Sequence, residues 1–257
     1  MVPPAPDPIP AATLVIFRRG RMGDAPELLM VVRSREMRFA GGMAVFPGGR
    51  VDDADRQLAR KALAHLDPDE AAHRIAAIRE TLEETGLAIG FTGMLDAARA
   101  AAARALALES GALAPVLDRL DLALDPAALV PFARWLPLGL AHDRIFDTRF
   151  YLADLGTGAV EVEVDATENT RLFWVSAREA LAMADRGEIK VIFPTRRNLE
   201  RLAQFGDFAA ARAHAEAIPV RTITPWISES DGLPSLCIPE DAGYPITMEP
   251  MSEVRRG

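Results

Sequence analysis

The sequence reads Gly48-Gly49-Arg50-Val51-Asp52-Asp53 and, after an interruption, Arg79-Glu80-Thr81-Leu82-Glu83-Glu84-Thr85-Gly86-Leu87. Glu80, Glu83 and Glu84 are spaced i, i+3 and i+4, which places them on one face of an α-helix. Three like charges so close together destabilise a helix unless a cation compensates them, and all-oxygen carboxylate sites suit Mg²⁺ or Mn²⁺. Because a glycine loop lets the backbone approach a phosphate group, the two stretches together indicate metal-assisted chemistry on a phosphorylated substrate.

The helix expected to carry these glutamates has sequence signals at both ends. Asp67-Pro68 suits an N-cap followed by the first helical residue, Glu70 stands at the capping-box position, and Gly86 suits a left-handed C-cap. An apolar stripe repeats at helical spacing on the opposite side from the glutamates and comprises Ala71, Ile75, Ile78 and Leu82. An isolated E-x-x-E-E is more often a solvated acidic face. The glycine loop and the flanking arginine and glycine favour the cation-binding interpretation.

These residues resemble the Nudix box, G-x5-E-x7-R-E-U-x-E-E-x-G-U, in which U is a bulky apolar residue. The matching positions are Gly49, Arg79, Glu80, Glu83, Glu84, Gly86 and Leu87. Asp55 stands in place of the first glutamate, and Thr81 stands where an apolar residue is usual. The spacer between Asp55 and Arg79 holds 23 residues, 56–78, in place of the x7 of the motif. The half of the box that carries the three glutamates is uninterrupted.

The resemblance extends to both sides of the box. The segment 32–52, which includes Arg33-Ser34 and Phe46-Pro47-Gly48-Gly49, looks like the segment that precedes the box in coenzyme A diphosphatases. The interrupted box and the later runs 146–151 and 193–199 are similar to the subgroup that contains the peroxisomal CoA diphosphatase with a long box insertion. This similarity covers roughly residues 12–205. It implies Mg²⁺- or Mn²⁺-dependent hydrolysis of the pyrophosphate linkage in CoA or acyl-CoA to 3′,5′-ADP and (acyl-)phosphopantetheine.

The resemblance also implies site residues. Glu80, Glu83 and Glu84 are expected to bind the metal, with Arg79 fixing their rotamers through an ion pair or a backbone carbonyl. A further acidic residue from a later loop is expected as base or metal ligand, and Glu168 is the first candidate, with Asp165 next. An ordinary surface position is an equal alternative for both. Substrate contacts are assigned to Gly48 and Gly49 and to three arginines that suit phosphate groups, namely Arg33, Arg38 and Arg149.

Two alternatives to the CoA diphosphatase hypothesis stay open. One is a Nudix hydrolase of another nucleoside diphosphate derivative, such as ADP-ribose or NADH. The other is a catalytically silent Nudix domain that senses a nucleotide, although the intact glutamates argue against silence. The sequence does not fix the acyl preference, the physiological metal or the oligomeric state, and a homodimer is left open.

Composition narrows the class of protein. The formal net charge of −8 argues against a nucleic-acid partner, because phosphate backbones require basic surfaces. Cys237 is the only cysteine, so an intrachain disulfide and a multi-cysteine zinc site are excluded. No secretory signal and no apolar run of membrane-spanning length is evident, so neither a membrane partner nor export is expected and a cytoplasmic location follows by default.

The order of expected elements is mixed α/β. It fits an α/β (α+β) fold, here a Nudix-type α/β/α sandwich with a mixed central sheet and helical insertions. Strands are expected at 13–17, 28–33, 43–46, 147–155, 160–164 and 170–175. Helices are expected at 55–65, 67–85, 95–109, 112–122, 176–187, 195–205 and 207–217, with a breaker region at 131–137. Residues 1–257 are expected to form a single Nudix hydrolase domain with a core of about 12–205, helical insertions at 54–66 and 95–134, and a proline-rich C-terminal extension at 218–257.

Overall fold

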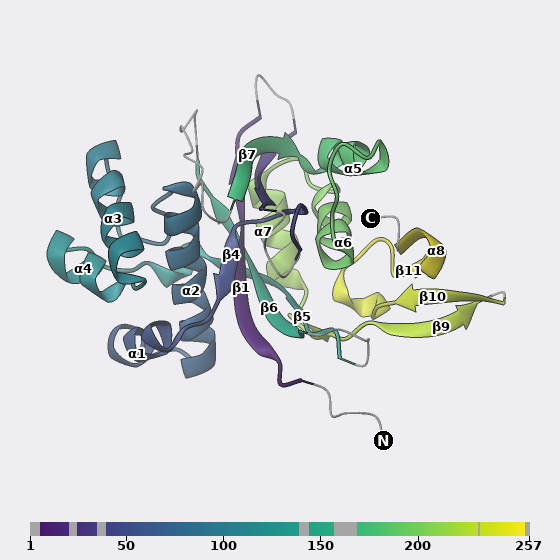
Figure 1. Ribbon diagram of the computed structural model, residues 1–257, viewed down its shortest axis with the longest axis horizontal. Helices are drawn as coiled ribbons and strands as arrows, with labels where there is room; N and C mark the ends of the chain where they lie inside the picture. The colour runs from purple at the N-terminus through teal and green to yellow at the C-terminus, as the bar shows by residue number, and fades with distance from the viewer. Residues whose placement is uncertain are drawn as a thin grey trace.

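The computed structural model describes residues 6–20, 25–34, 40–138, 144–156, 169–230 and 232–254. A mixed sheet runs through the middle and is covered by helices on both faces (Figure 1). Its strand order is β3-β2-β1-β6-β5-β8, with β4 also pairing with β1 and β7 with β2. These strands are β1 (Ile9–Arg18), β2 (Glu27–Arg33), β3 (Ala44–Val45), β4 (Gly48–Arg50), β5 (Val130–Trp135), β6 (Phe146–Asp154), β7 (Asn169–Ser176) and β8 (Thr222–Ile223). The expected α/β/α sandwich with a mixed sheet is confirmed.

The helices divide between the two faces of the sheet. One face carries α1 (Asp53–Ala62), α2 (Pro68–Thr85), α3 (Ala97–Ser110) and α4 (Ala114–Leu120). The other face carries α5 (Ala177–Asp185), α6 (Phe193–Leu202) and α7 (Phe208–Ala217). Short 3-10 turns occur at η2 (Pro126–Ala128) and η3 (Glu240–Ala242). None of the helices in the described ranges combines the length and the apolar character needed to cross a bilayer.

The central strand β1 explains why both faces need cover. Leu14 and Ile16 pack into the core beneath α2, whereas Val15 and Phe17 pack into the core beneath α6 and α7. All four side chains are almost fully buried. A strand buried on both faces has a continuous apolar run instead of an alternating pattern, as this one does. The sheet therefore separates two hydrophobic cores, and its position fixes where α2 lies.

Helix α2 follows its sequence signals closely. The Asp67 side chain accepts hydrogen bonds from the backbone N–H groups of Asp69 and Glu70, and Gly86 ends the helix with φ +74°. The expected apolar stripe is fully buried at all four of its positions, Ala71, Ile75, Ile78 and Leu82. The capping-box expectation for Glu70 is wrong, because the Glu70 carboxylate accepts hydrogen bonds from arginine side chains instead. The caps and the stripe together fix which face of α2 is left for the glutamates.

The structure corrects the expected breaker region at 131–137. Residues 130–135 form strand β5, which lies between β6 and β8 inside the sheet. The helical insertion expected over 95–134 therefore ends before this strand. The register of β5 shifts between Pro131 and Ala133, and such an irregularity lets a sheet accept a residue that lacks an N–H donor. Tertiary pairing thus overrides the local signal of proline.

The C-terminal extension forms a second, three-stranded sheet. Its order is β11-β10-β9, from β9 (Trp226–Ser230), β10 (Leu233–Cys237) and β11 (Met248–Pro250), followed by α8 (Met251–Val254). Tyr244 links this extension to the main body, because its hydroxyl accepts a hydrogen bond from Trp135 at 3.0 Å and donates one to Asn198 at 2.7 Å. The proline-rich extension expected over 218–257 thus contains short strands that pack on the main body. The expected strand at 160–164 lies outside the described residues.

Candidate active site

The glycine loop lies directly against the glutamate face of α2. The backbone N–H of Gly48 donates a hydrogen bond to Glu84 Oε2 at 3.0 Å. Gly49 lies so close to Glu80 that a Cβ atom at residue 49 would be 2.3 Å from that carboxylate. Strand β4 brings both glycines there by pairing with β1, on which α2 packs. The 23-residue insertion therefore leaves the glycine loop in contact with the glutamates.

Gly48 is required by geometry as well as by position. Its φ of +153° lies outside the range that side-chain-bearing residues adopt readily. A Cβ atom there would lie 2.3 Å from the carbonyl oxygen of Ala12 and 2.7 Å from Thr13 Cα. Both obstacles are backbone atoms of β1, which cannot move without disturbing the sheet. Only glycine therefore lets this N–H reach Glu84.

Arg79 is a buried hub that organises two of the three glutamates. Its guanidinium donates to Glu80 at 2.9 Å, to Glu83 at 3.0 Å and to the carbonyl oxygen of Arg50 at 3.0 Å. Asp55 accepts two further hydrogen bonds from it, each of 3.0 Å. Burial by itself lowers the pKa of Arg79, but the hydrogen bonds of Asp55 and the charge of Glu80 outweigh burial and raise it. The arginine is therefore a fixed cation, and it pairs both with glutamates and with a carbonyl, as expected.

Glu84 is the most deeply buried of the three glutamates. It is 3% exposed, and its Oε1 atom accepts a hydrogen bond from Asn169 Nδ2 at 3.1 Å. Burial raises the pKa of Glu84 to about 8, and the charge of Glu80 adds to the rise. Hydrogen bonds from Asn169 and Gly48 and the charge of Arg33 act in the opposite direction. A carboxylate in this setting is stabilised in its ionised form by any further cation that approaches it.

Glu83 is a second glutamate whose ionised form is destabilised by burial. Burial raises its pKa to about 7, against the charge of Arg79 and with that of Glu80. Its Oε1 atom is buried and accepts no hydrogen bond from any residue in the described ranges. An orphaned carboxylate oxygen and two carboxyl groups with raised pKa values fit a hard divalent cation, which prefers oxygen ligands.

The carboxylates do not yet converge on one point. Within the part of the chain that the structure describes, no three His, Cys, Asp or Glu side chains form a ready-made metal cluster. The reason is visible in the contacts: Arg79 lies between Glu80 and Glu83, while Glu84 is held by Gly48 and Asn169. Mg²⁺ usually keeps several waters and needs only one or two carboxylates, so the donor set still fits such an ion.

The arginines assigned to the substrate have different surroundings. Arg33 ends β2 close enough to Glu84 for its charge to lower the pKa of that carboxyl. Arg149 lies on β6, where it pairs with Asp69 and, at 2.7 Å, with Glu70. Glu70 and Glu80 are ten residues apart on α2, which corresponds to about 15 Å along the helix axis. The structure therefore brings Arg33, but not Arg149, to the glutamates; Arg38, Asp165 and Glu168 lie outside the described residues.

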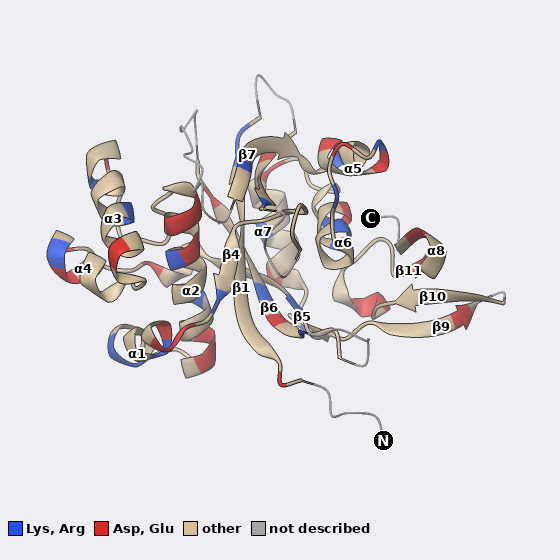
Figure 2. Cartoon of the chain, viewed as in Figure 1, with Lys and Arg blue, Asp and Glu red and all other residues tan. Residues whose placement is uncertain are grey.

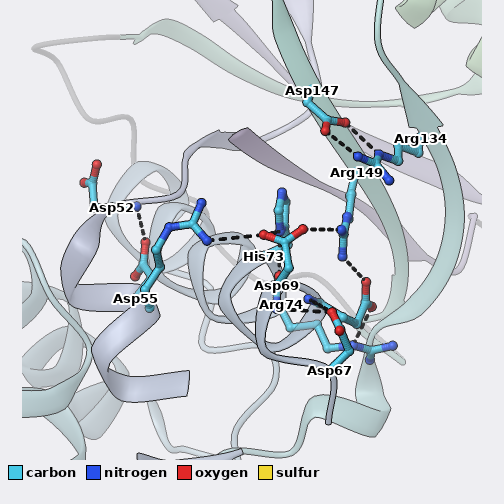
Figure 3. A network of polar contacts seen from close by, with 11 residues as sticks. Asp52, Asp55, Asp67, Asp69, His73, Arg74, Arg134, Asp147 and Arg149 are labelled. Carbon is cyan, nitrogen blue, oxygen red and sulfur yellow. Dashed lines mark hydrogen bonds and ion pairs between the residues drawn. The ribbon is translucent and has the colours of Figure 1, made fainter. Parts of the chain in front are cut away.

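The partners of Arg149 belong to a separate polar network at the start of α2, shown in Figure 3. Asp69 also pairs with Arg56 of α1 at 3.2 Å, and its carbonyl oxygen lies 2.6 Å from His73 Nδ1. Beside them on the sheet, Arg134 donates to both oxygens of Asp147, at 2.8 and 2.6 Å. Acidic and basic residues thus follow one another along α2 (Figure 2). The cations and carboxylates of this network neutralise each other. Its ion pairs therefore join α1, α2 and β6 and have a structural role.

A crystal structure of a Nudix hydrolase from Alicyclobacillus acidocaldarius matches 80% of this chain and 96% of its own, with 30% sequence identity and a TM-score of 0.69. The chain belongs to the Nudix hydrolase family. Acyl-coenzyme A diphosphatase NUDT19 of Gallus gallus is 28% identical over 276 residues, covering 85% of this chain and 73% of the chicken protein. No family model matches the sequence. The resemblance drawn from the interrupted Nudix box is confirmed.

Two further residues of this Nudix hydrolase site, Asp55 and Asn169, hold the Arg79–glutamate arrangement in place. Asp55 carries a signal that could have revealed it, because it stands at the first acidic position of the Nudix box, six residues after Gly49. It is 1% exposed and fixes Arg79 from α1. Asn169 has no comparable local signal, since it is the first residue of a strand and is separated from Glu84 by 85 residues. Only the order of strands in the sheet brings it to the site.

Proposed function

We propose that this Nudix hydrolase is a divalent-metal-dependent diphosphatase that cleaves the pyrophosphate linkage of CoA or acyl-CoA. The observation that supports it most is the glutamate face of α2, where the buried carboxylates of Glu83 and Glu84 have pKa values raised to about 7 and about 8. These groups favour a bound cation, and Nudix hydrolases generally use divalent metals. The similarity to chicken acyl-coenzyme A diphosphatase supports the choice of substrate.

In this proposal Glu80, Glu83 and Glu84 hold Mg²⁺ or Mn²⁺. A bound divalent cation neutralises diphosphate oxygens and lowers the pKa of a coordinated water. The protein holds the three carboxylates in place. Arg79 fixes those of Glu80 and Glu83, and the backbone N–H of Gly48 fixes that of Glu84. Holding the ligands in one arrangement before the substrate arrives reduces the reorganisation needed during the reaction.

The proton acceptor and the substrate contacts are further parts of the proposal. Glu168 is the proposed base that takes the proton from the attacking water, and Asp165 is the alternative. Arg33 and Arg38 are proposed to bind phosphate groups, because a buried phosphate without a cationic partner is costly. The placement of Arg33 near Glu84 supports its part in this assignment. Arg149 is the weaker candidate, since two carboxylates already neutralise it.

The test of function is a substrate screen with Mg²⁺ or Mn²⁺ present. CoA, acyl-CoAs, dephospho-CoA, ADP-ribose and NADH are compared by catalytic efficiency, with products identified by mass. CoA is expected to give 3′,5′-ADP and phosphopantetheine. The catalytic efficiency for dephospho-CoA is expected to be lower than that for CoA by the equivalent of about 1–3 kcal/mol, the scale of one charge-assisted hydrogen bond. A clear preference for ADP-ribose or NADH would overturn the CoA assignment and leave the diphosphatase assignment standing.

The test of the site uses substitutions that remove charge but keep size. Glu83→Gln and Glu84→Gln are each expected to reduce activity by about 10²-fold or more while the fold is retained. Glu216→Gln is the matched control, because Glu216 is exposed on α7 and, among the described residues, pairs only with Arg212 one turn away. If both site variants turned over substrate at the wild-type rate at saturating Mg²⁺, the proposed metal site would be refuted.

The cytoplasmic location and the homodimer are separate proposals, tested by cell fractionation and by light scattering.

A further inference from the structure

Asn169 occupies an unusual position for an amide side chain. It is the first residue of β7, pairs with Arg33 of β2 where the register of the two strands shifts, and is 1% exposed. Its Nδ2 atom donates to Glu84 Oε1 at 3.1 Å. Its Oδ1 atom is buried too, yet it accepts no hydrogen bond from the residues that the structure describes. One end of the amide is therefore used and the other is vacant.

A vacant buried acceptor is costly. Leaving such an oxygen without a donor costs about 1–3 kcal/mol, and most buried polar groups in folded proteins are paired for this reason. With Glu84 ionised, as a bound cation requires, reversing the amide gives no relief, because Oδ1 would then face the carboxylate and set two acceptors against each other. The orientation with Nδ2 toward Glu84 is thus imposed by the carboxylate. The amide oxygen is left beside the glutamates and needs a donor that the described residues do not supply.

The two oxygens of Glu84 complete the argument. Asn169 holds Oε1 from β7, and the N–H of Gly48 holds Oε2 from β4. A carboxylate offers about four lone-pair directions, so two hydrogen bonds fix its position and leave capacity for a cation. A side chain that served only to satisfy Glu84 would need no acceptor of its own. A donor that arrives with the cation, such as a water molecule of its hydration shell, satisfies Oδ1 as well.

We propose that Asn169 is a positioning residue of the cation site: its Nδ2 holds Glu84 in place, and its Oδ1 accepts a hydrogen bond from water that accompanies the cation. This inference rests on the proposed function, because it needs a cation at the glutamate face. Partners that orient metal ligands typically contribute 10- to 100-fold to metal affinity or activity. The amide is neutral, so it orders the site without adding to the negative charge of the three glutamates.

The test measures Mn²⁺ binding directly, by electron paramagnetic resonance of the free ion. Asn169→Ala is expected to raise the Kd for Mn²⁺ by about 10- to 100-fold. It is also expected to lower kcat, with KM at saturating Mn²⁺ changed less than about 3-fold. Asn169→Asp keeps an oxygen at the position of Oδ1 but replaces the Nδ2 donor to Glu84 with a second acceptor. Its Kd for Mn²⁺ is therefore expected to lie between those of the wild type and Asn169→Ala. If the alanine variant does not fold, Asn169→Ser takes its place, and its Kd for Mn²⁺ is likewise expected to be higher than that of the wild type.

The matched control is Asn198→Ala. Asn198 is also fully buried, uses one end of its amide in a hydrogen bond with Tyr244, and lies in α6 on the opposite face of the sheet. This variant is expected to lower thermal stability but to leave the Kd for Mn²⁺ unchanged. An unchanged Kd in Asn169→Ala, or an equal loss of affinity in Asn198→Ala, would overturn the inference. Failure of the proposed function is a different result, in which the wild-type enzyme neither binds Mn²⁺ nor hydrolyses any diphosphate.

Discussion

Asp55 gives the sharpest stability prediction, because it is a buried carboxylate with one cationic partner. It is 1% exposed and accepts two hydrogen bonds of 3.0 Å from Arg79, as well as one of 2.9 Å from the backbone N–H of Asp52. Removing one member of a buried ion pair costs about 3–5 kcal/mol, because the other charge stays buried without compensation. Arg79 keeps Glu80, Glu83 and the carbonyl oxygen of Arg50, which places the expected loss at the lower end.

We therefore expect Asp55→Ala to lower the free energy of unfolding by about 3 kcal/mol, or Tm by about 6–12 °C for a chain of this size. Asp55→Asn keeps the shape but replaces one acceptor oxygen with a donor, and a loss of about 2 kcal/mol is expected. The assay is urea unfolding followed by tryptophan fluorescence, with an unchanged m value showing that only stability has altered.

The control for Asp55 is Asp53→Ala in the same turn of α1. Asp53 is exposed and acidic like Asp55, so its replacement is expected to change the free energy of unfolding by less than about 0.5 kcal/mol. If Asp55→Ala were no less stable than this control, the buried pair would not be what fixes Arg79, and the reasoning that links the insertion to the glutamate face would be refuted.

Three further predictions concern positions where the structure separates two roles. Gly48→Ala is expected to destabilise the fold by about 2 kcal/mol or more, because its Cβ meets backbone atoms. Gly49→Ala instead displaces the end of the Glu80 side chain, so the free energy of unfolding in urea should stay near the wild-type value while the affinity for Mn²⁺ falls. Arg149→Met is expected to lower stability by about 1–2 kcal/mol with KM unchanged; a raised KM with full stability would show instead that it binds substrate. Burial raises the pKa of Glu200 to about 6, above its unfolded value, so the stability it provides is present at low pH and is lost as the pH rises. Wild type should lose about 1.5 kcal/mol relative to Glu200→Gln between about pH 4.5 and about pH 7, and a gain would contradict the sign.

Much of the protein could be predicted from short-range patterns. The caps of α2, its buried stripe and its glutamate face depend on residues three or four positions apart and on one left-handed glycine, so the local sequence encodes them completely. The Nudix box and its insertion also belong to the sequence alone, and they led to the correct fold class and family. The interpretation failed at residues 131–137, where proline signals a break locally but a sheet irregularity accommodates it.

Only the tertiary structure decided which distant groups meet. Asp55 reaches Arg79 across 24 residues, and Asn169 reaches Glu84 across 85, because β1 and β2 hold β4 and β7 beside α2. The same sheet gives Arg149 to the carboxylates at the start of α2, although its sequence context looked like that of a phosphate ligand. Local patterns fix the conformation of a segment through steric and hydrogen-bonding preferences within a few residues. The neighbours of a buried charge depend on strand order, which results from burying both faces of one sheet at once.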